Sequence, residues 1–223
     1  FFMLAGEAMS VTKVSKKIFN FAGSLVRHLP GGMAHVNILT SMFLAGCSGS
    51  SVADITGVGK LEIEAMEDAG MDKDFSAATT CASACLAPII PPSMNIVLYA
   101  SISGVSIGSM LVAGLTPGIL MAVCMMIYCY FYSKRKGFPV QPRVRAKELW
   151  KTFVGAIPAL LLPVIILGGI LSGKFTATEA AAVGAFYAIL LGMVFYRNLS
   201  FKGLMKICGN VGILAATTMC ISR

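Results

Sequence analysis

Long apolar stretches make up most of the chain, and their lengths distinguish helices that can cross a bilayer from helices that cannot. Residues 106–132, 153–172 and 177–196 are each apolar over the roughly 20 residues that a transmembrane helix needs. Residues 204–221 begin a further stretch of this kind, and residues 1–9 have the pattern of the end of one. We therefore predict a protein with several membrane-spanning helices.

Two shorter apolar arms, residues 34–47 and 52–68, flank a polar break that is rich in glycine and serine. Each arm is only about 20–25 Å long as a helix, which is too short to cross the hydrocarbon core. The pattern predicts a re-entrant helical hairpin whose two ends open on the same side of the membrane. The break has the sequence Gly46-Cys47-Ser48-Gly49-Ser50-Ser51-Val52-Ala53-Asp54.

The apolar stretch at residues 75–104 is long enough to cross but is interrupted at residues 88–93. Pro91 and Pro92 lack backbone N–H donors and disfavour a continuous helix, so we predict a broken transmembrane helix. Unwound backbone survives at membrane depth only inside protein or beside water. Paired breaks of this kind hold ions and solutes in secondary transporters, so the two breaks together predict a binding site near the bilayer midplane.

The bulk composition supports the membrane assignment. The 223-residue chain is 57% hydrophobic and 13% charged, with a mean hydropathy of +0.80, whereas soluble domains carry about 25% charged residues. We predict an all-α integral membrane protein with multi-span helices, a re-entrant helical hairpin and a broken transmembrane helix. We divide the chain into a membrane-helix end with an interfacial helix (1–33), the hairpin (34–74), the broken span and the span after it (75–133), a basic cytoplasmic loop or arm (134–152), and scaffold-like spans with the start of a second half (153–223).

The net charge of +8 arises mainly from three basic clusters, which hold fourteen of the 18 Lys and Arg residues. Such clustering between apolar segments follows the positive-inside rule, so we predict that all three face the cytoplasm and that nucleic acid is not a partner. Residues 10–30 carry the first cluster on an amphipathic pattern, which predicts an interfacial helix on the cytoplasmic side. The clusters are Lys13, Lys16, Lys17 and Arg27; Lys134, Arg135, Lys136, Arg143, Arg145, Lys147 and Lys151; and Arg197, Lys202 and Lys206.

The cysteines and histidines form no recognisable chemical site. The seven cysteines lack a C-x-x-C pair and lie mostly in apolar spans, which predicts buried thiols rather than zinc ligands. Residues 46–49 match the G-x-S-G motif of rhomboid intramembrane proteases, but a serine nucleophile needs a base, and no histidine follows His35. We therefore keep a rhomboid-like protease only as a distant alternative and predict that the chain is not an enzyme.

The first break suits ions of both signs. Its glycines free the backbone from helical geometry, and its hydroxyl and carbonyl oxygens suit a hard cation such as Na⁺. The N–H groups at the start of the following helix favour an anion such as a carboxylate. The alternative is a capped turn, with Ser50 or Ser51 as the N-cap and Asp54 in the first turn.

The second break offers unpaired carbonyls and the side-chain oxygens of Ser93 and Asn95, and its alternative is a simple proline kink. Asp54, the one acid that we place near the midplane, is either functional or a partner of the helix dipole. We expect Asn37 to cap or brace the hairpin. The predicted Na⁺ ligands are Ser48, Gly49, Ser50, Ser51, Pro91, Pro92 and Ser93. The predicted substrate-binding residues are Ser50, Ser51, Val52, Asp54 and Asn95.

Four blocks stand out by their order and spacing: FMLAGE at residues 2–7, LPGGMAHVN at 29–37, AGCSGSSVAD at 45–54 and PIIPPS at 88–93. Together they resemble the large membrane subunit, the DctM-like permease, of the tripartite ATP-independent periplasmic (TRAP) transporters. The resemblance implies Na⁺-driven uptake of an organic acid, such as a dicarboxylate or sialic acid, across a bacterial or archaeal cytoplasmic (inner) membrane. It implies no cofactor besides Na⁺ as the coupling ion.

The resemblance also implies partners and a mechanism. The partners are a small membrane subunit, a periplasmic substrate-binding protein and the lipid bilayer. The mechanism is an elevator in which residues 37–68 form the first hairpin and residues 75–104 carry the partner break. The family's second hairpin is absent from this sequence, so we expect the chain to be part of a larger permease and not to transport alone. A Na⁺-dicarboxylate symporter without a binding protein is the alternative.

Overall fold

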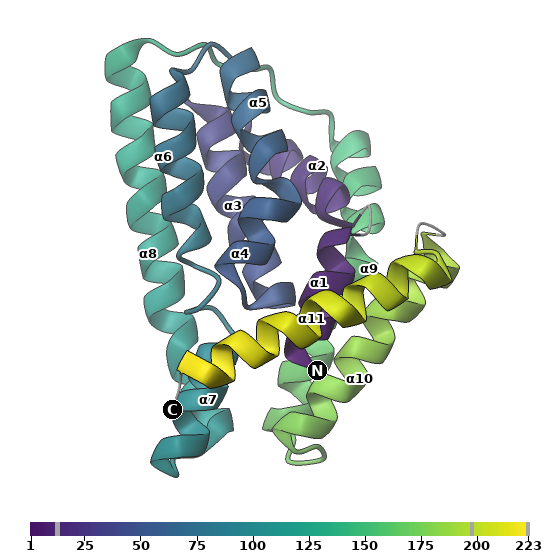
Figure 1. Ribbon diagram of the computed structural model, residues 1–223. Coiled ribbons are helices and arrows are strands. Elements are labelled where there is room, and N and C mark those ends of the chain that lie inside the picture. The colour runs from purple at the N-terminus through teal and green to yellow at the C-terminus, as the bar shows by residue number, and fades with distance from the viewer. Residues whose placement is uncertain (12–13, 197–198, 222–223) are drawn as a thin grey trace.

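The computed structural model describes residues 1–11, 14–196 and 199–221, and every regular element within these ranges is a helix. Lys13 and Arg197, which belong to two of the basic clusters, lie outside the described residues. Figure 1 shows α8, α6, α3 and α5 side by side, α9 and α10 on the opposite side of the molecule, and α11 crossing in front. The elements are α1 (Phe2–Val11), α2 (Val14–Val26), α3 (Gly32–Ser48), α4 (Ser51–Asp54), η1 (Ile55–Gly59), α5 (Lys60–Asp68), α6 (Lys73–Ala84), α7 (Met94–Ser103), α8 (Ile107–Lys136), α9 (Ala146–Leu171), α10 (Ala177–Leu190), η2 (Leu191–Phe195) and α11 (Phe201–Ile221).

Three helices in the described part of the chain are long and apolar enough to cross a membrane: α8, α9, and the continuous helix Ala177–Phe195 formed by α10 and η2. They coincide with the three full-length predicted spans. However, α9 begins at Ala146, inside the segment 134–152 that the sequence predicts as a loop or arm. Lys, Glu and Leu are good helix formers, and Glu148 in the first turn of α9 favours the helix dipole. The basic linker between α8 and α9 is therefore shortened to residues 137–145.

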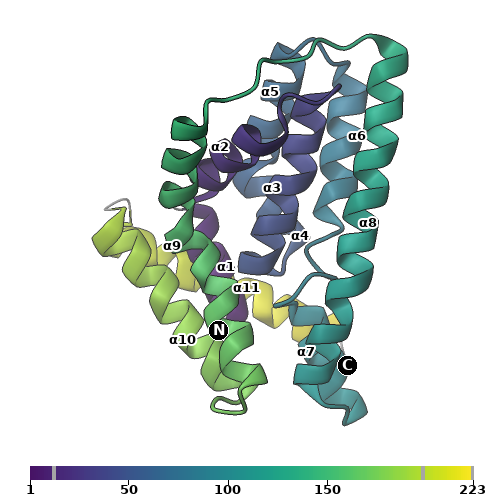
Figure 2. The ribbon, with the colours of Figure 1, turned by 180° about the vertical axis from the view of Figure 1, so that it is seen from behind.

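The predicted hairpin is present as two helical arms. The first arm is α3, and the second runs through α4, the π-helical turn η1 and α5. Both outer ends of the hairpin lie beside the basic linker and the end of α8. A Cβ added at Gly31 would collide with Ser133 of α8, and a Cβ added at Gly70 would lie 3.8 Å from Pro139 of the linker. The hairpin thus opens toward the end of the molecule that carries the linker (Figure 2). Its entry and exit on one side of a membrane stay a prediction.

The predicted broken helix is also present, as α6 and α7 joined by residues 85–93. The joining segment packs closely on α8, where Cβ atoms at Gly114 and Gly118 would collide with Ile89 and Ile90. At 1.5 Å per residue, these glycines lie about 10–17 Å from the start of α8. The break is therefore at a depth well inside a helix that is long enough to span a bilayer.

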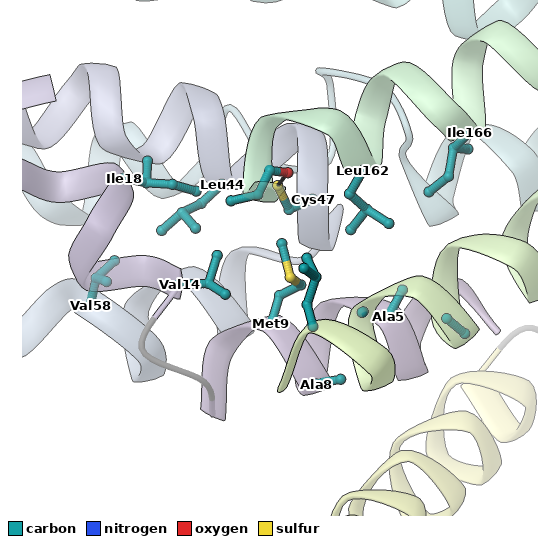
Figure 3. Packing of buried hydrophobic residues seen from close by; sticks show 14 of the residues in the cluster. Ala5, Ala8, Met9, Val14, Ile18, Leu44, Cys47, Val58, Leu162 and Ile166 are labelled. Atoms are coloured by element: carbon teal, nitrogen blue, oxygen red, sulfur yellow. Dashed lines mark hydrogen bonds between the residues drawn. The ribbon is translucent and has the colours of Figure 1, made fainter. Parts of the chain in front are cut away.

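Two buried apolar clusters hold the helices together, and α3 contributes to both. The first cluster joins α1, α2, α3, α9 and α10, and Figure 3 shows Leu44 and Cys47 of α3 close to Met9 and Leu162. The second joins α3 to α5, α8 and the segment that follows α6, and Ile38 is its largest fully buried member from α3. Burying a side chain of this size contributes about 1.5–3 kcal/mol. The first arm of the hairpin is thus anchored on both sides.

The helix α2 is amphipathic, as predicted, but its apolar face packs on protein. Ile18 and Phe21 are buried, and the Phe21 ring lies 5.8 Å from Phe43 of α3 and 5.4 Å from Phe153 of α9. The sequence pattern does not distinguish a bilayer surface from a protein surface, because either one buries the same apolar stripe. The cytoplasmic, interfacial location of residues 10–30 stays a prediction. Since the apolar face of α2 packs on protein, only its exposed basic face is available to contact the membrane surface.

The prediction that the cysteines are buried holds for only part of the set. Cys47 and Cys129 are buried, and for the others whose side chains the structure describes the prediction is wrong. The physical reason is that an apolar stretch of sequence does not reveal by itself which of its positions face the rest of the protein. The exposed cysteines are Cys81, Cys85, Cys124 and Cys208.

Candidate functional site

The two backbone breaks meet in the structure. Gly49 ends α3 in the left-handed conformation, with φ 60°. A Cβ at Gly49 would collide with the carbonyl oxygen of Pro92 and would lie 3.3 Å from the Cα of Ser93. Gly49 is therefore required both for its φ and for its lack of a side chain. The hairpin tip and the proline break form one backbone site, at the depth given by the contacts on α8.

The serine hydroxyls of the hairpin tip cap one helix and join two others. Ser50 is the N-cap of α4, and its Oγ accepts a hydrogen bond from the amide of Ala53 at 3.4 Å. The capping alternative is thus realised for Ser50. Ser51 donates to the carbonyl oxygen of Ala84 at 2.7 Å, which ties the second arm to the end of α6. Because a hydroxyl oxygen has two lone pairs, Ser51 can ligate a cation while it donates to Ala84.

Ser93 has a structural role at the second break. Its hydroxyl donates to the carbonyl oxygen of Pro88 at 2.6 Å and accepts from the amide of Ile96 at 3.4 Å, so it is the N-cap of α7. The side chain is fully buried. Ser93 therefore closes the proline turn and starts the second half of the broken helix. Its role as a Na⁺ ligand stays a prediction. Replacing Ser93 would remove these two hydrogen bonds as well as the proposed ligand oxygen.

A pocket of about 420 Å³ adjoins the hairpin tip. Val52 lines this pocket and is 61% exposed. The first amides of a helix have no acceptor within the helix, so the start of the second arm offers N–H donors beside the serine hydroxyls. Such a set suits an anionic group such as a carboxylate. The lining includes Ser48, Ser50 and Val52 from the hairpin, Gly6 and Glu7 from α1, and Asn210 from α11.

Three of the predicted substrate-binding residues, Ser51, Asp54 and Asn95, do not line this pocket. Asp54 is 4% exposed and lines a neighbouring cavity of about 10 Å³. Asn95 is exposed in the first turn of α7. Asp54 is separated from the pocket because residues two apart on a helix do not share a face, and Val52 already faces the pocket. Of the predicted set, the structure thus brings Ser50 and Val52 to the pocket, beside Ser48, and places Ser51, Asp54 and Asn95 elsewhere.

Sequence reasoning missed the burial of Glu62. This acid belongs to the charged end of the second arm, yet it is only 1% exposed. Asp54, Val58 and Glu62 recur every four residues, which is the spacing of one helix face, and all three are buried. That spacing was the signal from which the burial of Glu62 could have been predicted.

A buried chain of hydrogen bonds braces the hairpin against α6, as expected for Asn37. The Asn37 side chain donates to Thr80 Oγ1 at 2.6 Å and accepts from Ser83 Oγ at 2.7 Å. Ser41 Oγ, one turn after Asn37, donates to Ser83 Oγ at 3.1 Å. Buried polar groups are destabilising unless they are paired, so these bonds fix the position of α3 on α6.

The geometry gives no support to a protease. His35 lies on the same helix as Ser48 but 13 residues earlier, about 20 Å away. Its Nε2 pairs with the carbonyl oxygen of Pro30 at 3.2 Å. The second histidine, His28, precedes α3 altogether. Neither histidine can act as a base for the serine of the G-x-S-G motif.

Comparison with known proteins identifies the family. A family model described as "Tripartite ATP-independent periplasmic transporter, DctM component" matches residues 1–222. The chain belongs to this family. The members that it resembles are transporter permeases, and the DctM family together with the three candidate spans shows a multi-pass membrane protein.

Several curated DctM-family relatives are similar over nearly the whole chain. The sialic acid TRAP transporter large permease protein SiaM of Vibrio cholerae is 44% identical over 207 residues, which are 93% of this chain and 48% of the relative. The 2,3-diketo-L-gulonate TRAP transporter large permease protein YiaN of Escherichia coli is 40% identical over 93% of this chain and 49% of its own length. The C4-dicarboxylate TRAP transporter large permease protein DctM of Pseudomonas aeruginosa is 37% identical over 99% and 52%. The chain spans about half the length of these relatives.

Proposed function

We propose that this chain forms part of the large permease subunit of a TRAP transporter that takes up an organic acid together with Na⁺. In the proposal, a periplasmic binding protein delivers the substrate, and a small membrane subunit completes the transporter in the cytoplasmic membrane. The observation that carries the proposal is the contact between Gly49 and Pro92, which brings together two unwound backbone segments well inside the length of a spanning helix.

The chemistry of the relatives supports the substrate class. Their names specify sialic acid, 2,3-diketo-L-gulonate and C4-dicarboxylates, and all of these carry a carboxylate. The 420 Å³ pocket offers the first amides of the second arm and the hydroxyls of Ser48 and Ser50 to such a group. We infer that the carboxylate of the substrate binds there.

The proposed Na⁺ position lies between the two breaks. The C-terminal end of α3 carries free carbonyls and the negative end of the helix dipole, and the proline segment adds carbonyls without helical partners. Na⁺ held there would fix the hairpin tip in the shape that binds the carboxylate. Na⁺ and substrate would then strengthen each other's binding reciprocally. The proposed ligands come from Ser48, Gly49, Ser50, Ser51, Pro91, Pro92 and Ser93.

The test uses the complete transporter in proteoliposomes with its binding protein. Uptake of a panel of organic acids is measured with an inward Na⁺ gradient and with choline in place of Na⁺. We expect uptake of at least one acid that requires both Na⁺ and the binding protein. Uptake without the binding protein would instead indicate the Na⁺-dicarboxylate symporter, and equal uptake in choline would contradict Na⁺ coupling.

A further inference from the structure

A small cavity lies where the hairpin meets α1 and α2, beside the larger pocket at the tip. Its volume is about 10 Å³, which is about enough for one species the size of a water molecule. Asp54 reaches it from the second arm and Ser15 from α2. The remaining lining residues are Gly6, Met9, Leu44, Cys47, Ser48 and Ala53.

Two buried oxygen atoms at this cavity lack partners. Asp54 Oδ1 and Ser15 Oγ have no hydrogen-bond partner among the residues that the structure describes. The two residues are only 4% and 5% exposed. Unpaired buried oxygens are strongly unfavourable, most of all on a carboxylate, so both point to a bound species.

The lining selects a cation over an anion. The end of α3 contributes Cys47 and Ser48, and the last carbonyls of a helix carry the negative end of its dipole. Asp54 adds a carboxylate. Within the described part of the chain, the lining contains no Lys, Arg or His. A dehydrated Na⁺ is smaller than a water molecule and prefers oxygen ligands, so it matches both the size and the chemistry.

We propose that this cavity binds one small monovalent cation, with Asp54 Oδ1 and Ser15 Oγ as its side-chain ligands. The cation joins α2 to the second arm of the hairpin, so its binding affects how firmly the arm is held. This site is distinct from the Na⁺ position at Gly49 and Pro92. The inference deepens the proposed Na⁺ coupling and rests on it for the identity of the cation as Na⁺.

The test measures Na⁺-dependent stabilisation of the complete permease with its small subunit, in detergent and without substrate. Thermal unfolding is followed while NaCl replaces choline chloride at constant ionic strength. The variants are Asp54→Asn and Ser15→Ala. Thr40→Ala is the control, because Thr40 is uncharged, is fully buried in the hairpin, donates only to Val36 of its own helix and does not line the cavity.

We expect the half-stabilising Na⁺ concentration to rise about tenfold or more in Asp54→Asn and about threefold or more in Ser15→Ala. It should stay within about twofold of the wild-type value in Thr40→Ala. Unfolding in choline alone reports any general loss of stability. If Asp54→Asn does not assemble, Ser15→Ala carries the test.

Three results would overturn the inference. They are unchanged Na⁺ titrations in both cavity variants, which would indicate a structural water only; a shift in Asp54→Asn without one in Ser15→Ala; or an equal shift in Thr40→Ala. These results leave the proposed function intact if wild-type uptake still requires Na⁺. Conversely, uptake that is independent of Na⁺ contradicts the proposed coupling, whatever the unfolding titrations show.

Discussion

At the residue scale, Gly49 combines two requirements that can be separated by mutation. It has a left-handed φ of 60°, and the carbonyl oxygen of Pro92 occupies the space of its absent side chain. Gly104 has a φ of 69° and no atom within 4 Å of an added Cβ. A non-glycine residue in this conformation costs about 1–2 kcal/mol, and this applies at both positions. The difference between the effects of an alanine substitution at Gly49 and at Gly104 therefore measures the contribution of the contact between the two breaks.

We predict that Gly49→Ala abolishes Na⁺-dependent uptake by the complete transporter and lowers its unfolding temperature more than Gly104→Ala does. The reason is that the added methyl group must push the hairpin tip away from Pro92. Uptake and thermal unfolding are measured on the same preparations. Equal effects of the two substitutions would show that the contact contributes nothing beyond backbone strain.

A second prediction at this scale concerns Ser51. If its oxygen helps to hold Na⁺, Ser51→Ala removes a charge-linked contact worth about 1.5–3 kcal/mol, and the half-saturating Na⁺ concentration for uptake rises about ten- to a hundredfold. A role limited to the bond with Ala84 predicts lower stability with the same Na⁺ titration. Ser101→Ala is the control, because Ser101 is exposed on α7 and donates to Val97 of its own helix at 2.8 Å.

At the element scale, the hairpin and the broken helix were predictable because length, glycine and proline act locally. The arm at residues 34–47 was too short to cross, and Pro91-Pro92 removed two helical donors. The partner of α2 depends on which helices pack together, and no local pattern identifies that partner, whereas the burial of Glu62 could have been predicted from its four-residue spacing to Val58 and Asp54. The same holds for the site: the breaks were visible in the sequence, whereas the separation of Asp54 from the pocket depends on how the second arm is rotated.

We predict that Asn37→Ala destabilises the docking of α3 on α6. The substitution removes two buried hydrogen bonds, one to Thr80 and one to Ser83, which keep only their bonds to backbone carbonyls of α6 and to Ser41. The loss of the two bonds costs about 1–3 kcal/mol. Thr40→Ala is the control, since Thr40 is equally buried but donates to Val36 of its own helix. The unfolding temperature of the complete permease should fall clearly further for Asn37→Ala, and equal losses would contradict the bracing role.

At the scale of the whole molecule, the basic linker and both ends of the hairpin lie at one end, and the loop after α7 lies at the other end of α8. We predict that cysteines introduced at Asp68 and Val140, in a cysteine-free transporter, react from the cytoplasmic side, and that one at Ser103 reacts from the opposite side. Membrane-impermeant labelling of right-side-out and inside-out vesicles measures this. Labelling of positions 68 and 140 from opposite sides would exclude a re-entrant hairpin.

The bracing of α3 also sets an order of events during synthesis. Asn37 finds its partners 43 and 46 residues later in the chain, at Thr80 and Ser83. A nascent chain that ends before Ser83 therefore holds an arm that is too short to span and whose polar groups are unpaired. We expect such an arm to be a poor independent membrane helix. On this reasoning the hairpin waits for α6 to emerge from the ribosome, and we predict that the two enter the membrane as one unit.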